Sequence, residues 1–315
     1  MEYVKLPEVA SPVSRVGLGG CPLGGHGWGE VDDRNSVEAV RRAVDGGVNL
    51  FDTADIYGLG HSEQILSEAL GYRRHDLVIA SKFGVRRTSE GKTLFDNSPE
   101  WLDEALTGSL KRLRLDCIPL YYLHWPDGKT PIEAAVEAMD AQRRAGRIGA
   151  IALSNVTADE LNLACGVARI SAVQVQYSLV DRVAAEALAA TARRHGVPLI
   201  TWGSLAQGLL TGKYDEHSRF DASDRRSRYE NFTGEKFQLN LRTVTKLKQI
   251  APQYRRSPGQ VAIRWLLDTP SVGAVLFGAK HPNQVEENLG ATDWHLSTEH
   301  YLRLDGGLME SQAAA

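Results

Sequence analysis

Eight short apolar runs recur along this 315-residue chain, and they constrain its fold more than any other feature. Amphipathic segments separate them. Most of the runs are continuously apolar rather than alternating, as is typical of strands that are buried on both faces of a parallel sheet. We therefore expect eight buried strands, at residues 15–19, 48–52, 77–82, 118–124, 150–154, 172–176, 198–202 and 273–277.

The segments between these runs carry the start and stop signals of helices. Ser98-Pro99 combines an N-cap residue with proline at the first helical position. Residues 130–133, 157–160 and 257–260 each have the Ser/Thr-x-x-Glu/Gln pattern of a capping box. Glycines that suit the left-handed position after a helix are Gly46, Gly71, Gly146 and Gly196.

Eight strand signals, each followed by a helical or loop segment, predict a (β/α)8 TIM barrel, a fold that typically takes about 250 residues. The surplus lies in three places: an N-terminal β-hairpin under the barrel within residues 1–14, a long connection at 203–256, and extra C-terminal helical structure after Thr292. No Ser-, Pro- or Gly-rich run resembles a linker. We therefore expect a single domain over residues 1–315.

The rival fold is a doubly wound parallel sheet that binds a dinucleotide. Such a fold would carry a G-x-G-x-x-G fingerprint after its first strand. The Gly-rich stretch at residues 17–29 has no such pattern in the right place, so the sequence favours the barrel.

The charge of the chain argues against a nucleic-acid partner. Its formal net charge is -3 and its pI is about 6.3, whereas nucleic-acid binders usually carry a strongly basic face. The basic clusters are short and are expected to be mostly solvated: Arg41–Arg42, Arg73–Arg74, Arg86–Arg87 and Arg225–Arg226.

Cysteine usage and hydropathy predict a cytoplasmic protein. The three cysteines, Cys21, Cys117 and Cys165, are far apart and form no C-x-x-C pair, which argues against a disulfide framework or a zinc site. The first residues lack the pattern of a signal peptide, and no apolar run approaches the roughly 20 residues of a membrane helix. We expect no membrane partner and no bound metal.

Polar residues end three successive strand runs. Asp52, Lys82 and His124 lie there, and Tyr57 follows Asp52 on the next loop. Any one of them also suits a helix cap or an ion pair at the edge of the core. In a barrel, however, the carboxyl ends of all strands meet at one mouth, which is where active sites lie.

These four side chains together suit proton delivery to a carbonyl oxygen. A tyrosine, with an ordinary pKa of about 10, donates its proton at neutral pH when a nearby ammonium stabilises the phenolate. Lys82 can supply that charge, and Asp52 can hold Lys82 ionised in a partly desolvated site. His124 can hydrogen-bond the carbonyl oxygen or pass a proton. Reduction also needs a hydride, which a nicotinamide cofactor would supply.

Seven segments in order now show that the chain resembles the aldo-keto reductase superfamily over almost its whole length. The bacterial NADPH-dependent members are the most similar. The segments are NLFDTADIYG (49–58), IASK (79–82), YLHW (122–125), IGAIALSN (148–155), QVQYS (174–178), WGSLAQGLLTGKY (202–214) and GAK (278–280) with Gln284 and Glu287-Asn288.

The resemblance implies a role for each matching residue. Asp52, Tyr57, Lys82 and His124 would form the catalytic tetrad, and Tyr57 would donate the proton. The resemblance also assigns three sets of residues to the three parts of a nicotinamide cofactor. Ser154, Asn155 and Gln174 would hold the nicotinamide carboxamide, and Trp202 would stack on its ring. The pyrophosphate would lie along Gly203, Ser204, Leu205, Gln207, Gly208 and Lys213, and the adenosine end would lie at Gly278, Lys280, Gln284, Glu287 and Asn288.

The chain departs from the common pattern at a few positions. Trp202 stands where many members have Tyr, which resembles the potassium-channel β-subunit branch, and Ser204 and Phe277 stand where Pro is usual. A cation at the adenosine end would favour NADP over NAD. Lys280 is our assignment for that cation, with Arg225 or Arg226 as the alternatives, so the expected cofactor is NADPH.

Three aromatic residues that follow strand ends, Trp28, Phe83 and Trp125, are predicted to line an apolar substrate pocket. The expected substrate is a small aldehyde or ketone, a sugar-like carbonyl or a biosynthetic keto compound. The sequence does not fix the oligomeric state.

Two other functions remain open at this point. The same residues would catalyse the reverse reaction, an NAD(P)-dependent oxidation of a sugar hydroxyl. A non-catalytic subunit that senses NADP(H) is the second alternative. Trp202 favours the sensing subunit, whereas His124 argues against it, because the channel β-subunits carry another residue there.

Overall fold

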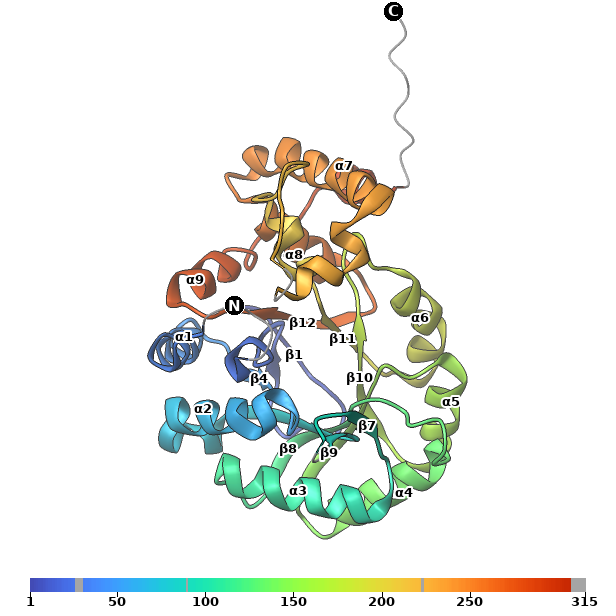
Figure 1. Cartoon of the computed structure of the whole chain (residues 1–315). Helices are drawn as coiled ribbons and strands as arrows, with labels where there is room; N and C mark the ends of the chain where they lie inside the picture. Colours follow the sequence, from blue (N-terminus) through green and yellow to red (C-terminus); the bar gives the residue numbers. More distant parts are fainter. Residues whose placement is uncertain (26–30, 89, 222–223, 307–315) are drawn as a thin grey trace, which may run out of the picture.

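Eight parallel strands close into a barrel in the computed structural model, which describes residues 1–25, 31–88, 90–221 and 224–306 (Figure 1). Each barrel strand pairs with the next one along the chain, and the last pairs with the first. The strands are β3 (Val16–Gly19), β4 (Leu50–Asp52), β5 (Val78–Phe83), β8 (Ile118–Leu123), β9 (Ile148–Ser154), β10 (Ile170–Gln176), β11 (Leu199–Trp202) and β12 (Val272–Gly278). Each of the eight predicted runs overlaps one of them, which confirms the predicted barrel.

Helices surround the ring of strands in Figure 1. They are α1 (Asp33–Asp45), α2 (His61–Leu70), α3 (Pro99–Leu113), α4 (Ile132–Arg144), α5 (Ala158–Val167), α6 (Val183–His195), α7 (Gly234–Ile250), α8 (Pro258–Asp268), α9 (Pro282–Leu289) and α10 (Thr298–Asp305). The long connection after β11 contains α7, and α10 follows the last barrel unit. The extra C-terminal helices are thus confirmed.

Three of the four predicted helix starts are confirmed. Ser98 caps α3 with its side chain, and Thr157 and Ser257 begin reciprocal capping boxes at α5 and α8. The capping box predicted at Thr130 is wrong. Pro131 is the N-cap residue of α4, where no side chain caps the helix, and the Thr130 hydroxyl donates to a carboxylate oxygen of Asp127, 2.8 Å away.

The helix stop predicted at Gly46 is confirmed, because α1 ends at Asp45 and Gly46 is its C-cap, but the predicted left-handed conformation is wrong. Gly46 has φ −80°, and the left-handed residue after α1 is Gly47, at φ 86°. Close packing of α1 against α9 explains the glycine at 46. A Cβ atom there would lie 2.3 Å from a methyl carbon of Leu289. Gly46 is therefore required for the approach of two helices, a requirement that local sequence does not reveal.

Alanines and larger apolar side chains together fill the barrel interior, and the N-terminal segment closes its lower end. The inward-facing cluster combines residues such as Ala80 and Ala152 with Leu120 and Tyr122, and Leu6 of the N-terminal segment belongs to it. The strands β1 (Tyr3–Val4) and β2 (Val13–Ser14) pair antiparallel and form the predicted hairpin. The amino ends of the strands are thus covered, which leaves the carboxyl ends as the open end of the barrel.

A second hairpin lies between β5 and α3, where none is predicted. It consists of β6 (Val85–Arg87) and β7 (Thr93–Phe95), which pair antiparallel. Its segment borders the carboxyl end of β5, so it lies beside the mouth of the barrel.

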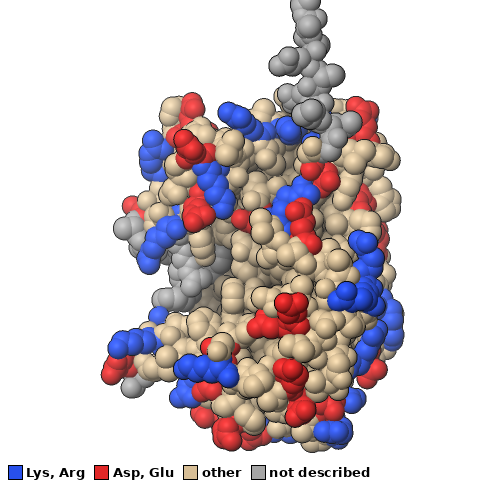
Figure 2. Space-filling model, turned by 90° about the vertical axis from the view of Figure 1, so that its right-hand side faces the viewer, with Lys and Arg blue, Asp and Glu red and all other residues tan. Residues whose placement is uncertain are grey.

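The surface carries both signs of charge. Lys and Arg are interspersed with Asp and Glu on the face that Figure 2 shows. Within the described ranges, no helix is both long and apolar enough to span a membrane, and no group of three or more His, Cys, Asp or Glu side chains is placed to hold a metal ion.

Candidate active site

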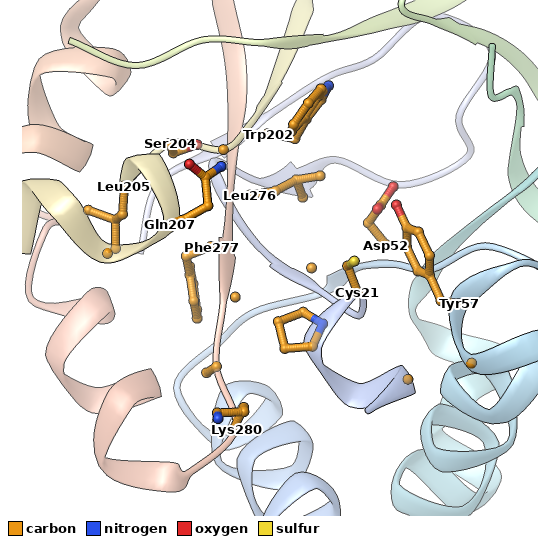
Figure 3. Close-up of a pocket in the computed structure, with 18 of the residues that line it drawn as sticks. Cys21, Asp52, Tyr57, Trp202, Ser204, Leu205, Gln207, Leu276, Phe277 and Lys280 are labelled. Atoms are coloured by element: carbon orange, nitrogen blue, oxygen red, sulfur yellow. The ribbon is translucent and has the colours of Figure 1, made fainter. Parts of the chain in front are cut away.

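A cavity of about 1440 Å³ opens at the carboxyl end of the barrel. That volume exceeds the roughly 300–1,000 Å³ of ordinary small-molecule pockets, so the cavity has room for a dinucleotide beside a small substrate. Most of the residues assigned from sequence line it: Asp52, Tyr57, His124, Trp125, Ser154, Asn155, Gln174, Trp202, Gly203, Ser204, Leu205, Gln207, Gly208, Lys213, Gly278, Lys280, Gln284, Glu287 and Asn288. In Figure 3, Asp52 and Tyr57 lie side by side, and Lys280 lies apart from them.

The strand ends bring the tetrad together. Asp52 is the last residue of β4, Lys82 lies at the carboxyl end of β5, and His124 directly follows β8. These three strands are neighbours in the barrel. Tyr57 begins a short 3₁₀ turn, Tyr57–Gly60, that leads into α2. Because parallel strands end at the same edge, four residues distant in sequence meet at one end of the cavity.

Lys82 is a fully buried ammonium with oxygen partners around it. Its Nζ lies 2.6 Å from Oδ1 of Asp52 and 2.8 Å from the carbonyl oxygen of Thr53. The other carboxylate oxygen of Asp52 accepts a hydrogen bond of 2.7 Å from the Gln174 amide. A buried ion pair of this kind is stable when such extra hydrogen bonds satisfy its remaining atoms. The Asp52 carboxylate is therefore fixed from both sides, and it fixes Lys82.

Tyr57 extends toward this ammonium. Its hydroxyl oxygen lies 3.5 Å from Nζ of Lys82, and Nζ is 5.0 Å from the centre of its ring. An ammonium at this distance stabilises the negative charge that appears on a phenol oxygen when its proton leaves.

His124 packs edge-on against Tyr57 with ring centres 5.7 Å apart. Burial, and then the charge of Lys82, lower the pKa of His124 well below its ordinary value. Its Nδ1 has no hydrogen-bond partner among the described residues. His124 is therefore a neutral imidazole at physiological pH, suited to hydrogen bonding with a polar substrate atom rather than to carrying charge.

Asn155 links three strand ends. Its amide nitrogen donates to the His124 carbonyl oxygen at 3.0 Å and to the Ser154 hydroxyl at 2.9 Å, and its amide oxygen accepts from the Trp202 indole at 3.3 Å. Asn155 has φ 58°, a left-handed conformation that asparagine tolerates better than most residues. The amide thus fixes the edge of the cavity on which the indole of Trp202 lies.

The segment after β11 follows the cavity wall in an unusual backbone conformation. Gly203, Ala206, Gln207 and Gly208 all have positive φ values, of 68°, 47°, 53° and 91°. Successive residues of this kind turn backbone N–H groups toward one side, an arrangement that suits anions.

Three cations lie at the end of the cavity away from Tyr57. They are Lys213, Arg226 and Lys280, and Arg226 is one of the two arginines named above as alternatives to Lys280. Burial, followed by the charges of Arg226 and Lys213, lowers the pKa of Lys280. Asp224 pairs with Arg226 and offsets part of this repulsion. An anionic ligand would relieve the rest, so these residues fit a phosphate.

A buried ion pair supports the turn that carries Tyr57. Glu63 of α2 is fully buried, and its two carboxylate oxygens each lie 2.5 Å from a donor, the Ser81 hydroxyl of β5 and Nε of Arg112 of α3. The Arg112 side chain packs against Gly60, where a Cβ atom would lie 2.5 Å from its Cδ. The pair thus joins two helices and a strand behind the tyrosine turn.

One expected pocket residue lies elsewhere. Phe83 is fully buried, and its ring stacks on Tyr121 with centres 5.8 Å apart. Successive strand residues point to opposite faces, so Phe83 points out toward the helices because Lys82 points in. The prediction that Phe83 lines the substrate pocket is therefore corrected. Trp125 does line the cavity, whereas Trp28 lies outside the described residues.

Several residues that sequence reasoning missed line the cavity beside Tyr57. The turn contributes Ile56 and Leu59, and the β6–β7 hairpin contributes Val85, Arg87, Thr93 and Phe95. A sequence signal for the hairpin exists. Two short runs rich in strand-forming residues flank a turn segment with glycine, S-E-G-K at 89–92.

Comparison with known proteins assigns the family. A model of the Aldo/keto reductase family matches residues 15–307. Aldo-keto reductase YhdN of Bacillus subtilis is 35% identical over 302 residues, covering 95% of this chain and 91% of that protein. A probable voltage-gated potassium channel subunit beta of Oryza sativa is 33% identical over 310 residues, covering 93% and 92%.

A solved structure agrees with both the fold and the family. The glycerol dehydrogenase AKR11B4 from Gluconobacter oxydans superimposes with a TM-score of 0.90 at 32% identity, covering 96% of this chain and 94% of that one. With the family model and the barrel, these matches establish that the chain is an oxidoreductase of the aldo/keto reductase family.

Proposed function

We propose that the protein reduces the carbonyl group of aldehydes or ketones with NADPH and that Tyr57 donates the proton. The observation that carries the proposal is the position of Nζ of Lys82, 2.6 Å from Asp52 and 3.5 Å from the Tyr57 hydroxyl. An ammonium beside a phenol hydroxyl favours proton donation by the tyrosine, because it stabilises the phenolate that remains afterwards.

The chain's own groups account for the polar half of the reaction. A bound nicotinamide cofactor would supply the hydride, which adds to the carbonyl carbon. The Tyr57 proton goes to the carbonyl oxygen as that oxygen becomes an alkoxide, and the phenolate charge is held by Lys82. The neutral ring of His124 is placed to orient the oxygen. Proton exchange with solvent restores the tyrosine.

The cation cluster supports NADPH over NADH. Lys280, Arg226 and Lys213 lie together at the far end of the cavity, and the lowered pKa of Lys280 reflects their mutual repulsion as well as burial. A 2′-phosphate adds charge that these cations would bind. Gln284 holds this segment, because its side-chain oxygen accepts from the Lys280 backbone N–H at 2.7 Å.

Oxidation of a hydroxyl is the second candidate function. The solved relative is a glycerol dehydrogenase, and the same four side chains would run the step in reverse, with the Tyr57 phenolate accepting a proton. Oxidation of glycerol with NADP⁺, measured beside reduction of glyceraldehyde with NADPH, separates the two directions.

The test is the Tyr57→Phe variant. We expect its kcat for NADPH-dependent reduction of a neutral aldehyde to fall by roughly 10²–10⁴-fold, since it loses the acid but little volume. NADPH binding, followed by titration calorimetry, should be retained and tighter than NADH binding. Equal activity of parent and variant would remove Tyr57 from the mechanism. A parent that binds NADPH yet reduces no carbonyl would favour the sensing role.

A further inference from the structure

The end of the cavity beyond Tyr57 is apolar and open. Leu59, Phe95 and Trp125 line it, and their side chains remain 65%, 47% and 39% exposed. The rings of Phe95 and Trp125 meet at an angle, with centres 6.4 Å apart. Large apolar side chains clustered at an open cavity are typical of a binding surface rather than of a core.

The β6–β7 hairpin turns one of its faces to this apolar end. Its register places Val85 opposite Phe95 and Arg87 opposite Thr93. Because directly opposed residues of an antiparallel pair point to the same side, these four share a face. All four line the cavity, whereas the residues between them, Arg86 and Leu94, do not.

The two adjacent arginines of β6 therefore have different environments. Arg86 pairs with Asp96 at 3.0 Å and lies over the Trp101 ring at 4.5 Å, so it attaches the hairpin to α3. The side chain of Arg87 is exposed to solvent and has no ion pair or hydrogen bond within the described part of the chain. The acidic residue at the hairpin tip, Glu90, is 3.1 Å from Lys92.

The charges along the cavity divide into two groups. The cluster of Lys213, Arg226 and Lys280 lies at the end assigned to the cofactor's adenosine. At the Tyr57 end Asp52 is already bound to Lys82, which leaves Arg87 as the one cation without a partner among the described residues lining that end.

We propose that this end of the cavity selects carbonyl substrates that carry an anionic group. Arg87 binds the anion, and the carbon skeleton lies against Phe95 and Trp125. The guanidinium is suited to this task, since its donors match a carboxylate or a phosphate in a two-point contact. The inference rests on the proposed function, because it places the reacting carbonyl at Tyr57.

The test compares matched pairs of charged and neutral aldehydes with NADPH. One pair is 4-carboxybenzaldehyde and its methyl ester, and the other is glyceraldehyde 3-phosphate and glyceraldehyde. For the better pair, we expect the parent's kcat/KM to favour the charged member by about tenfold, the usual order for a charged hydrogen bond. The difference should lie in KM, because Arg87 touches a part of the substrate that does not react.

Variants of the hairpin test whether Arg87 causes the preference for the charged aldehyde. Arg87→Gln should bring the charged-to-neutral ratio close to one, and Arg87→Glu should invert it. Lys92→Gln is the matched control. It removes the same charge from the same hairpin, but Lys92 is paired with Glu90 and does not line the cavity, so the parent ratio should persist.

The outcomes separate this inference from the proposed function. A charged-over-neutral preference in either pair that is lost in Arg87→Gln supports it, and the pair concerned distinguishes carboxylate from phosphate. A ratio near one in both pairs, or a ratio that Arg87→Gln leaves unchanged, overturns it. If the parent reduces none of the four aldehydes, the proposed function itself fails.

Discussion

At the scale of single residues, the buried Lys82 ammonium governs the electrostatics of the site. Asp52 and the Thr53 carbonyl surround the Lys82 ammonium, while burial and then the charge of that ammonium lower the pKa of His124 well below its ordinary value. One buried cation thus serves two neighbours in opposite ways. It favours charge on the phenol oxygen and disfavours charge on the imidazole.

A pH-dependent loss of stability follows from His124. The unfolded chain protonates this histidine below pH about 6.5, whereas the folded protein, with its lowered pKa, does not. The unfolded state therefore binds more protons, and the free energy of unfolding falls as pH decreases. The contribution is about 1.4 kcal/mol for each pH unit below 6.5, until the folded pKa is reached.

Urea unfolding at pH 7 and pH 5 measures this contribution. The His124→Gln variant should lose less stability than the parent between the two pH values, whatever the substitution costs at pH 7. Parallel pH dependence in parent and variant would show that His124 ionises normally in the folded protein.

Residue-level chemistry was largely predictable from the sequence, and the failure at Phe83 has a simple reason. Strand ends were identified correctly, so the residues that end them were placed at the mouth. Side chains alternate between the two faces of a strand, so Lys82 and its neighbour Phe83 cannot both point into the site. Placing Lys82 at the mouth already turns Phe83 toward the helices, and the prediction for Phe83 overlooked this alternation.

At the scale of elements, contacts between helices decide what local sequence cannot. Gly46 ends α1 without the predicted left-handed conformation, and its missing side chain leaves room for Leu289 of α9. The β6–β7 hairpin escaped prediction because each strand has three residues, too few to show a clear period. Both features depend on partners distant in sequence, whereas the caps at Ser98, Thr157 and Ser257 depend on neighbours alone.

The Glu63–Arg112 pair between α2 and α3 should be essential to stability. In Arg112→Met the Glu63 carboxylate stays fully buried without its cation, and losing one partner of a buried pair typically costs about 3–5 kcal/mol. Arg112 is itself about a quarter exposed, so we expect the lower part of that range. Urea unfolding of parent and variant measures the difference.

The matched control is Arg73→Met. Arg73 pairs with Asp45 at 3.4 Å, and both side chains are 62% exposed, so its loss should change the free energy of unfolding by less than about 1 kcal/mol. If the two variants lose similar free energies of unfolding, the Glu63–Arg112 pair contributes no more than an exposed ion pair.

At the scale of the whole molecule, the N-terminus contacts the segment that follows α9, far along the chain. The terminal amine of Met1 lies 2.7 Å from Asp293, and Glu2 lies 2.6 Å from the fully buried guanidinium of Arg264 in α8. The N-terminal hairpin therefore does more than cover the lower end of the barrel. It also brings Glu2 to a buried guanidinium in a distant part of the chain, which Asp268 contacts from within α8 at 2.8 Å.

Removing the negative charge of Glu2 should lower the free energy of unfolding. Glu2→Gln leaves Arg264 with a poorer partner, and because Glu2 is about a quarter exposed we expect a loss of about 1–2 kcal/mol in the free energy of unfolding. Glu230→Gln provides the comparison, since Glu230 is 84% exposed and pairs with Lys236 on the surface. Chemical denaturation of both variants should separate them, and equal losses would contradict the role given to Glu2.

The attachment of the β6–β7 hairpin has an evolutionary consequence. Asp52, Lys82 and His124 lie at the ends of strands that are hydrogen-bonded on both sides within a closed ring, whereas the hairpin lies between β5 and α3 with its own ladder and its own anchor at Arg86. Its cavity face can thus acquire a new charge, ring or length without moving these three side chains. Under the proposed function, substrate range and chemistry are encoded in separable parts of the chain, so selection could alter the first while the second is inherited intact.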